Sequence, residues 1–196
     1  MKRTGLIIAC AVLAIAAVSA GLAWRGVSRP HSPAPSAIGG PFHLTDDNGR
    51  GIDQSILAGK WSVVYFGYTF CPDVCPTTLA ALGQAIPRLG TRASDVQVVF
   101  ITVDPGRDTP TQLKAYLASP SFPPDTVGLT GSAAAIKAVA GEYHVYYARH
   151  GSGEDYSVDH TSILYLMDPK GRFVQPIAVG PPAAMAAQIS SAMASG

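Results

Sequence analysis

Apolar positions are most concentrated in the first 25 residues of the chain. Lys2 and Arg3 precede an uncharged run over residues 4–24, which ends in a tryptophan. About 20 apolar residues span a bilayer, whereas the core of a signal peptide needs only about 7–15. The length of the run therefore favours an uncleaved single-pass membrane anchor over residues 1–25. A cleaved signal peptide is the alternative, because residues 18–20 read Val-Ser-Ala, a small-residue cleavage signature.

The apolar pattern stops after this run. Residues 26–41 are rich in proline, serine, glycine and alanine, which predicts a linker. The tail ahead of the anchor is too short to hold a folded domain, so we expect residues 42–196 to be exported. This expectation puts the globular part on the periplasmic side of the cell inner membrane. Such a compartment is oxidising, so cysteines there must be paired, metal-bound or kept reduced by a dedicated donor.

From residue 42 onwards, strand patterns alternate with helix patterns. Single strands are predicted over 61–70, 96–103, 126–129 and 143–147, and strand pairs joined by turns over 42–52 and 162–177. One helix is predicted to start at Pro72 and to include residues 77–86. A second starts at Pro110, behind a cap at Asp108 or Thr109, and two more cover residues 132–143 and 181–194. The polar, glycine-rich segment 150–157 predicts a mobile loop.

This order of elements indicates an α/β fold. Strands alternating with helices and ending in a hairpin and a helix describe a three-layer domain over residues 42–196, with a hairpin at its N-terminal end. A buried strand that runs directly into a cysteine at a helix start is typical of the thioredoxin-like arrangement. We therefore predict a thioredoxin-like domain, preceded by the linker and one transmembrane helix.

The composition narrows the classes of function. Of the 196 residues, 47% are hydrophobic and 14% are charged, and the net charge is +1. A chain with so little net charge and no basic patch has no long-range attraction for nucleic acid. We therefore expect no nucleic-acid partner, and contact with the membrane only through the N-terminal helix.

Two of the three cysteines lie where a predicted strand meets a predicted helix. Cys71 and Cys75 have three residues between them, against two in thioredoxin-type redox motifs. If Cys71 occupies the N-cap, Cys75 lies one turn further on the same face, with Cβ atoms about 5–6 Å apart. That spacing suits two thiolates on one metal ion, and the helix N-terminus favours thiolates. A disulfide is the alternative, as a redox couple or as a structural bridge, although so small a ring removes little chain entropy.

A tight metal site needs a third ligand, and the candidates are the five histidines. Four of them lie in the linker, in the opening hairpin, or in or near a loop, where solvated or hydrogen-bonded side chains are expected: His31, His43, His144 and His150. His160 precedes the final predicted hairpin, where thioredoxin-like proteins often carry a cis-proline that faces the active cysteines. We expect its imidazole to face the cysteine pair, with Asp159 either orienting the ring or only ending the loop.

Two thiolates and one imidazole form a soft donor set with few ligands. Such a set prefers Cu(I), and it also accommodates Cu(II). Zinc accepts the same three ligands with a water as the fourth, so the residues alone leave zinc open.

Three segments of the chain resemble the Sco/SenC family: YTFCPDVCPTTL, VFITVDPGRDTP and VDHTSILYLMDPKGRF. Members of that family are membrane-anchored, thioredoxin-like copper proteins that help to assemble the binuclear copper centre of cytochrome c oxidase. The resemblance runs from Pro41 to the C-terminus. It implies that Cys71, Cys75 and His160 are copper ligands, that the VDPGRDTP connector is mainly structural, and that Asp73 tunes the site or favours the helix start.

The function implied by this resemblance is that of a copper metallochaperone. Such a protein binds one copper ion and delivers it to the copper-bearing subunit of cytochrome c oxidase. Expected partners are that subunit, an upstream periplasmic copper donor and a thiol reductant. The alternative is a thiol–disulfide oxidoreductase in which Cys71 and Cys75 form the redox pair and keep the oxidase's copper-ligand cysteines reduced. A copper or redox sensor is a third option, whereas a peroxiredoxin is disfavoured because Pro72 stands where those enzymes carry Thr or Ser.

Overall fold

The computed structural model describes residues 38–153 and 155–195. The segment 1–25, for which a membrane anchor is predicted, lies outside these ranges, as does most of the predicted linker 26–41. Within the described ranges, no helix has both the length and the apolar character that crossing a membrane requires. The anchor therefore stays a prediction.

A seven-stranded mixed sheet forms the centre of the domain, in the order β2-β1-β5-β4-β3-β8-β9. Its strands are β1 (His43–Asp46), β2 (Gly51–Asp53), β3 (Trp61–Gly67), β4 (Val96–Thr102), β5 (Val127–Thr130), β8 (Leu164–Met167) and β9 (Phe173–Ile177). β3, β4 and β5 run parallel to one another, and β8 pairs with β3 in the antiparallel sense. Every residue of β3 is buried, as expected of a central strand that is covered on both faces.

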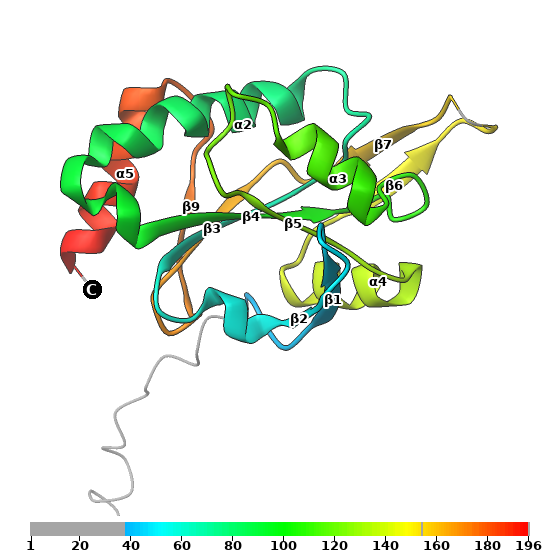
Figure 1. The fold of residues 1–196 in the computed structure, drawn as a ribbon, viewed down its shortest axis with the longest axis horizontal. Helices are drawn as coiled ribbons and strands as arrows, with labels where there is room; N and C mark the ends of the chain where they lie inside the picture. Colours follow the sequence, from blue (N-terminus) through cyan, green and yellow to red (C-terminus); the bar gives the residue numbers. More distant parts are fainter. Residues whose placement is uncertain (1–37, 154, 196) are drawn as a thin grey trace, which may run out of the picture. The chain divides into compact units, whose positions relative to one another are not determined.

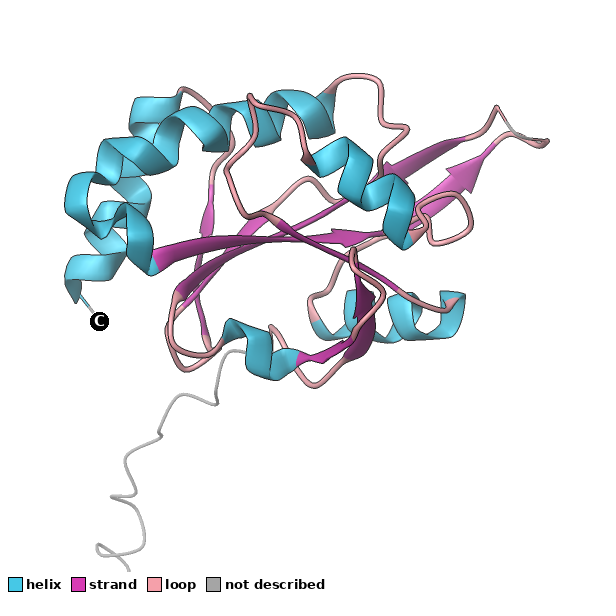
Figure 2. Cartoon of the chain, in the orientation of Figure 1, coloured by secondary structure: helices cyan, strands magenta, loops and turns pink. Residues whose placement is uncertain are grey.

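Helices cover both faces of this sheet and complete three layers (Figures 1 and 2). The side chains of α2 (Val74–Ala85), α3 (Pro110–Leu117), α5 (Pro182–Ser195) and the 3-10 segment η2 (Ile86–Asp95) join one apolar core cluster. Those of α4 (Ala133–Glu142) and of the 3-10 segment η1 (Gln54–Leu57) join the cluster on the opposite face. This arrangement confirms the predicted three-layer α/β class.

Most predicted elements are present close to their predicted positions. The N-terminal hairpin is formed by β1 and β2, and the last hairpin by β8 and β9. Of the two cap candidates for α3, Thr109 is the cap, because its hydroxyl accepts a hydrogen bond of 3.2 Å from the Gln112 N–H. Asp108 is instead fully buried.

The segment between α4 and β8 differs from the prediction, and it carries a site residue. The expected strand over 143–147 is wrong: Tyr143 is the C-cap of α4, His144 adopts a left-handed backbone with φ 54°, and the strand begins only at Tyr147. Tyr143 is almost fully buried, so its apolar character reflects packing of the helix end rather than a strand. β6 (Tyr147–His150) and β7 (Ser157–His160) then form a hairpin, and the predicted loop 150–157 is shortened accordingly.

Candidate metal centre

Both cysteines of the Cys-x-x-x-Cys motif lie beyond the end of β3, but not quite as predicted. α2 begins at Val74 with Asp73 as its N-cap, so Cys71 precedes the helix instead of capping it. The backbone N–H of Cys71 donates to the carbonyl of Tyr68, which closes a turn between strand and helix. Cys75 lies in the first turn of α2 and is fully buried. Asp73 therefore marks the helix start, one of its two predicted roles.

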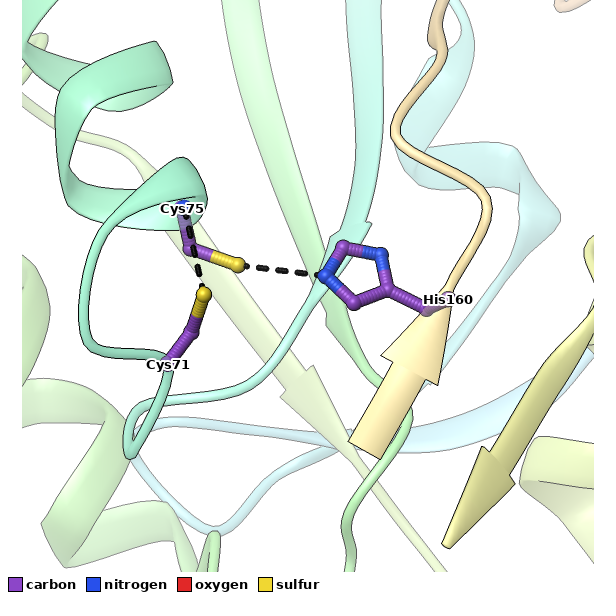
Figure 3. A group of neighbouring side chains, drawn as sticks. All are labelled: Cys71, Cys75 and His160. Atoms are coloured by element: carbon purple, nitrogen blue, oxygen red, sulfur yellow. Dashed lines mark hydrogen bonds between the residues drawn. The ribbon is translucent and has the colours of Figure 1, made fainter. Parts of the chain in front are cut away.

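Cys71 nevertheless receives help from the helix N-terminus. The backbone N–H of Cys75 donates to the Sγ atom of Cys71 across 3.4 Å (Figure 3). This N–H is one of the unpaired donors at the start of an α-helix, and such donors stabilise negative charge. The pair is therefore built with one sulfur at the helix start and one inside its first turn.

The third member of the group of candidate ligands is His160, the last residue of β7. Its Nε2 atom lies 3.4 Å from the Sγ atom of Cys75, and the ligand atoms of Cys71, Cys75 and His160 all lie within 4.8 Å of one another. Figure 3 shows the imidazole directed at the two sulfurs. The structure thus brings together the three residues that the sequence singles out as ligands. Within the described residues, these three form the sole cluster of three or more Cys, His, Asp and Glu side chains with this geometry.

The ring of His160 is oriented by the backbone and by two tyrosines. Its Nδ1 atom lies 3.2 Å from the carbonyl oxygen of Thr161, which can only accept, so Nδ1 carries the proton and Nε2 keeps its lone pair for a metal. Tyr68 and Tyr65 flank the ring edge-on, with centroids 5.9 and 6.4 Å away. No sequence pattern points to this role of Thr161 or of the two tyrosines.

Asp159 does not orient His160. Its carboxylate pairs with the exposed His150 at 3.0 Å, and 70% of the Asp159 side chain is exposed to solvent. The reason is strand geometry, because neighbouring side chains of β7 point to opposite faces. Of the two roles predicted for Asp159, orientation of the imidazole is therefore absent from the structure.

The two thiols differ sharply in acidity. The neighbouring Cys75 thiol, aided by the backbone N–H groups of Cys75 and Asp73, lowers the pKa of Cys71 to about 5, against the effect of burial. The hydrogen bond between the Cys75 thiol and the Cys71 sulfur, together with burial, raises the pKa of Cys75. We assign the first ionisation to Cys71, because it is half-buried and faces a backbone donor. A thiolate that exists near neutral pH is ready to bind a soft metal ion.

Gly67 makes room for the buried sulfur. A Cβ atom at this position would lie 2.9 Å from the Sγ atom of Cys75 and 2.8 Å from the ring of Phe100. Glycine is therefore required at the end of β3 for the first turn of α2 to approach the sheet so closely. A glycine that ends an otherwise apolar strand is a sequence signal that could have identified this contact.

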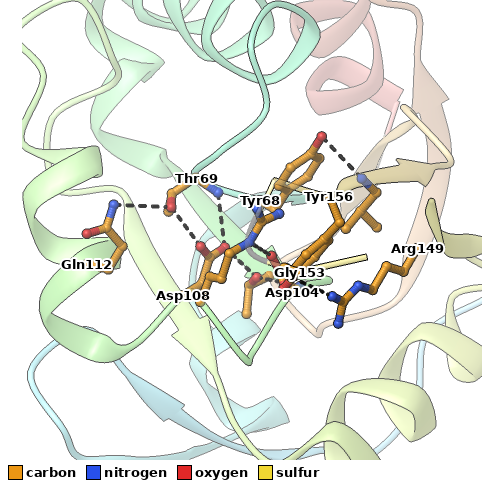
Figure 4. A network of polar contacts seen from close by, with 11 residues as sticks. Tyr68, Thr69, Asp104, Asp108, Gln112, Arg149, Gly153 and Tyr156 are labelled. Carbon is orange, nitrogen blue, oxygen red and sulfur yellow. Dashed lines mark hydrogen bonds and ion pairs between the residues drawn. The ribbon is translucent and has the colours of Figure 1, made fainter. Parts of the chain in front are cut away.

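A polar network fixes the loop that precedes Cys71 (Figure 4). The buried carboxylate of Asp108 accepts hydrogen bonds from the backbone N–H of Thr69 at 3.0 Å, from the Thr69 hydroxyl at 2.6 Å and from the Thr102 hydroxyl at 2.6 Å. These bonds tie the cysteine loop to the end of β4. The VDPGRDTP connector therefore has the structural role that the resemblance implies.

The fold and the site define a class of protein: a thioredoxin-like domain with a cysteine pair facing a histidine. The model of the SCO1/SenC family matches residues 30–194, so the chain belongs to that family. It is 45% identical over 146 residues to Protein SCO1 homolog 1, mitochondrial, of Arabidopsis thaliana, a match that covers 74% of this chain and 43% of that protein. The chain therefore matches less than half of the length of this relative.

Two solved structures extend the comparison. The copper-bound ScoI of Bradyrhizobium japonicum is similar with a TM-score of 0.71 and 44% identity, over 79% of this chain and 98% of that one. BsSco, in which a disulfide switch was identified, is a member of the Sco family of cytochrome c oxidase assembly proteins. It is similar with a TM-score of 0.60 and 27% identity, over 78% of this chain and 91% of that one.

Proposed function

We propose that this protein binds one copper ion through Cys71, Cys75 and His160 and delivers it to the copper-bearing subunit of cytochrome c oxidase during assembly. The observation that carries the proposal is the convergence of two sulfurs and one imidazole nitrogen within 4.8 Å. Soft donors in so small a number suit Cu(I) better than zinc, which favours four ligands. The copper-bound relative from Bradyrhizobium supports the same metal.

The exposure of the ligands suits transfer of the ion. Cys75 is buried, whereas Cys71 and His160 are half-buried, so an incoming ligand reaches the ion from their side. A Cu(I) ion tolerates two- and three-coordinate intermediates, so the ligands of a recipient can replace these residues one at a time. Delivery by ligand exchange therefore needs no unfolding of the domain.

The proposal extends to the surroundings of the site. The segment 1–25 would hold the domain at the periplasmic side of the cell inner membrane, within reach of a membrane-bound oxidase. A periplasmic copper donor would load the protein, and a thiol reductant would keep both cysteines reduced. These partners follow from the chemistry of a dithiol site in an oxidising compartment.

A competition experiment with a Cu(I) chelator tests the proposal. The full chain is purified in detergent, reduced, and compared with His160→Ala and with His43→Ala, a control at an exposed histidine of β1. We expect His160→Ala to weaken Cu(I) binding by about 100-fold or more and His43→Ala to leave it unchanged. Equal Cu(I) affinity in the wild type and His160→Ala would show that His160 is not a ligand. Weak Cu(I) binding in the wild type and both variants would contradict the proposal of copper delivery.

The acidity of Cys71 favours a second candidate function. A thiolate with a pKa of about 5 next to a second thiol is suited to thiol–disulfide exchange. In this reaction the Cys71 thiolate attacks a disulfide of the oxidase subunit, and Cys75 then resolves the mixed disulfide. The subunit gains two electrons and becomes a dithiol, while this protein leaves as a disulfide for the thiol reductant. The disulfide switch of BsSco supports this alternative.

The two functions separate in the same set of variants. A thiol–disulfide oxidoreductase loses its reductase activity in Cys71→Ser but keeps most of it in His160→Ala, because the imidazole takes no part in sulfur exchange. A copper chaperone loses copper transfer in both variants. The measurement is the free thiol content and the copper content of the oxidised recipient domain after incubation with each variant.

A further inference from the structure

His160 is carried by an element that is separate from the main sheet. β6 and β7 form their own two-stranded sheet, in which Tyr147 pairs with His160 and Arg149 pairs with Val158. None of the described strands of the seven-stranded sheet pairs with this hairpin. The distance between His160 and the cysteines therefore depends on the short link from His160 to β8 and on the side chains that hold the hairpin against the rest of the domain.

Tyr156, directly before β7, lies between two guanidinium groups. The Cζ atoms of Arg107 and Arg149 each lie 3.6 Å from the centroid of its ring. We refer to Arg149, Tyr156 and Arg107 as the arginine–tyrosine stack. Its three members come from β6, from the residue before β7 and from the loop after β4, so the stack joins the hairpin to the connector between β4 and α3.

The stack continues towards the cysteine loop. The guanidinium of Arg107 also lies 4.6 Å from the ring of Phe70, the residue directly before Cys71. Its Nε donates to Asp104 at 2.5 Å, and the hydroxyl of Tyr156 donates to the other oxygen of the same carboxylate at 2.6 Å (Figure 4). The hairpin, the connector and the cysteine loop are thus linked side chain to side chain.

A second contact shows how this link reaches the imidazole. The backbone N–H of Val158 donates to the hydroxyl of Tyr68 at 3.3 Å, two residues after Tyr156 and two before His160. The ring of Tyr68 in turn packs edge-on against the ring of His160, and it lies 5.8 Å from the Arg107 guanidinium. Displacement of Tyr156 would therefore move the strand that ends in His160.

We infer that Tyr156 and Arg149 are positioning residues of the metal centre, which hold His160 at the cysteine pair through the arginine–tyrosine stack. The inference rests on the proposed copper site and adds the residues that assemble it. An ion that needs three ligands binds with an affinity proportional to the fraction of molecules in which all three are in place. The two π-faces of the Tyr156 ring attract the guanidinium groups of Arg107 and Arg149. Without the ring, the two positive charges would face each other with no aromatic group between them.

The test is a double-mutant cycle on Cu(I) affinity in the full chain, measured by chelator competition. Tyr156→Leu removes the aromatic face, and we expect about a 10-fold loss of affinity, at the lower end of the range for residues that support metal ligands. In a His160→Ala background the same substitution should cause no further loss, because its effect passes through the imidazole. Tyr146→Leu is the matched control, since 67% of the Tyr146 side chain is exposed just before β6.

A conservative variant and a spectroscopic measurement separate positioning from folding. Tyr156→Phe keeps the stack and loses only the bond to Asp104, so it should restore affinity to within about 3-fold of wild type. In the Cu(II) form, the nitrogen hyperfine signal of the imidazole should weaken in Tyr156→Leu and return in Tyr156→Phe. Loss of stability alone would not produce this pattern, because folded molecules would keep the signal.

Other outcomes overturn the inference, and they differ from failure of the proposed function. Wild-type affinity in Tyr156→Leu, or an equal further loss in the His160→Ala background, would show that the stack does not act through His160, while the copper site stands. If His160→Ala itself binds copper like the wild type, the ligand assignment fails and the inference falls with it.

Discussion

The Nε2 atom of His160 lies 3.4 Å from the Sγ atom of Cys75, although 85 residues separate the two along the chain. Cys75 is fixed in a helix that packs on the central sheet, whereas His160 ends a hairpin outside that sheet. The site therefore depends on the placement of two separate elements. Substitutions that disturb either element should affect metal binding without touching a ligand.

Substitution of Gly67 disturbs the element that carries the cysteines. In Gly67→Ala, the new methyl group would contact the Sγ atom of Cys75 at 2.9 Å, so the first turn of α2 must shift. We expect a loss of about 1–3 kcal/mol in the free energy of unfolding and weaker Cu(I) binding. Urea-induced unfolding and chelator competition measure the two effects.

Gly141 provides the matched control for this substitution. It lies within α4, and a Cβ atom there meets nothing within 4 Å. Gly141→Ala should therefore raise the free energy of unfolding by about 0.5–1 kcal/mol and leave copper affinity unchanged. A rise in the free energy of unfolding in both alanine variants would contradict the close approach of Cys75 to the end of β3.

The acidity of Cys71 predicts selective alkylation of the reduced, metal-free protein. Because its pKa is lowered to about 5, Cys71 is a thiolate at pH 7 and should react with iodoacetamide first. The rate should be nearly constant from pH 8 to pH 6 and should fall as the pH drops through about 5. Cys75 should react far more slowly, because it is buried and its pKa is raised.

Mass spectrometry of the alkylated peptides, after reaction at a series of pH values, measures both rates. Cys71→Ser is the control: the pH-insensitive labelling should disappear in this variant. A rate that falls below pH 8.5, as for an ordinary thiol, or first labelling at Cys75, would contradict the assignment of the first ionisation to Cys71.

The main sheet could be predicted from the sequence because its central strands have a simple pattern. Residues 61–67 and 96–102 are almost continuously apolar. Pro110 marks the start of the following helix, and the turn residues 168–171 mark the last hairpin. The cysteine pair and His160 could be predicted because their residue types and the resemblance agree. The central strands, the two cysteines and His160 can each be recognised from the residues around them.

The β6–β7 hairpin could not be predicted, because its strands are short and mostly polar. Residues 147–150 read Tyr-Ala-Arg-His and residues 157–160 read Ser-Val-Asp-His, and Val158 alone among them is buried. The surroundings of Tyr156 also depend on contacts between distant parts of the chain, since Tyr156 bonds to Asp104, 52 residues away. α2 starts at Val74 instead of the predicted Pro72, and the sequence does not separate the two because Pro72 and Asp73 are both typical of a helix N-terminus.

The carboxylate of Asp108 predicts a large effect on stability. It is fully buried and accepts three hydrogen bonds from Thr69 and Thr102. Asp108→Ala would leave the buried Thr102 hydroxyl and the half-buried Thr69 donors without this acceptor, so we expect a loss of about 2–4 kcal/mol in the free energy of unfolding. Asp95→Ala, at an exposed aspartate, should change it by less than about 0.5 kcal/mol. Equal effects in urea-induced unfolding would mean that the Asp108 network contributes nothing.

A related carboxylate, Asp168 in the β8–β9 turn, predicts a dependence of stability on pH. It accepts hydrogen bonds from the backbone N–H groups of Lys170 and Arg172 at 2.8 and 2.9 Å, and from the Arg172 guanidinium at 2.8 Å. Burial opposes the ionised form, but these bonds outweigh it and hold the pKa of Asp168 below its ordinary value. The stabilisation is therefore complete above the unfolded pKa of about 3.9 and is lost as the pH falls through the folded value.

Asp168→Asn tests this dependence. At pH 7 it should lower the free energy of unfolding by about 1–2 kcal/mol, because a neutral amide is a weaker acceptor for these donors than a carboxylate. The difference from wild type should shrink progressively below pH 3.9, where the unfolded carboxylate takes up its proton. Asp46 accepts the same three kinds of hydrogen bond from Asn48 and Arg50 in the first hairpin. The stability of Asp46→Asn should therefore show the same dependence on pH. A deficit that stays constant from pH 7 to pH 2.5 in urea-induced unfolding would contradict the lowered pKa of these two carboxylates.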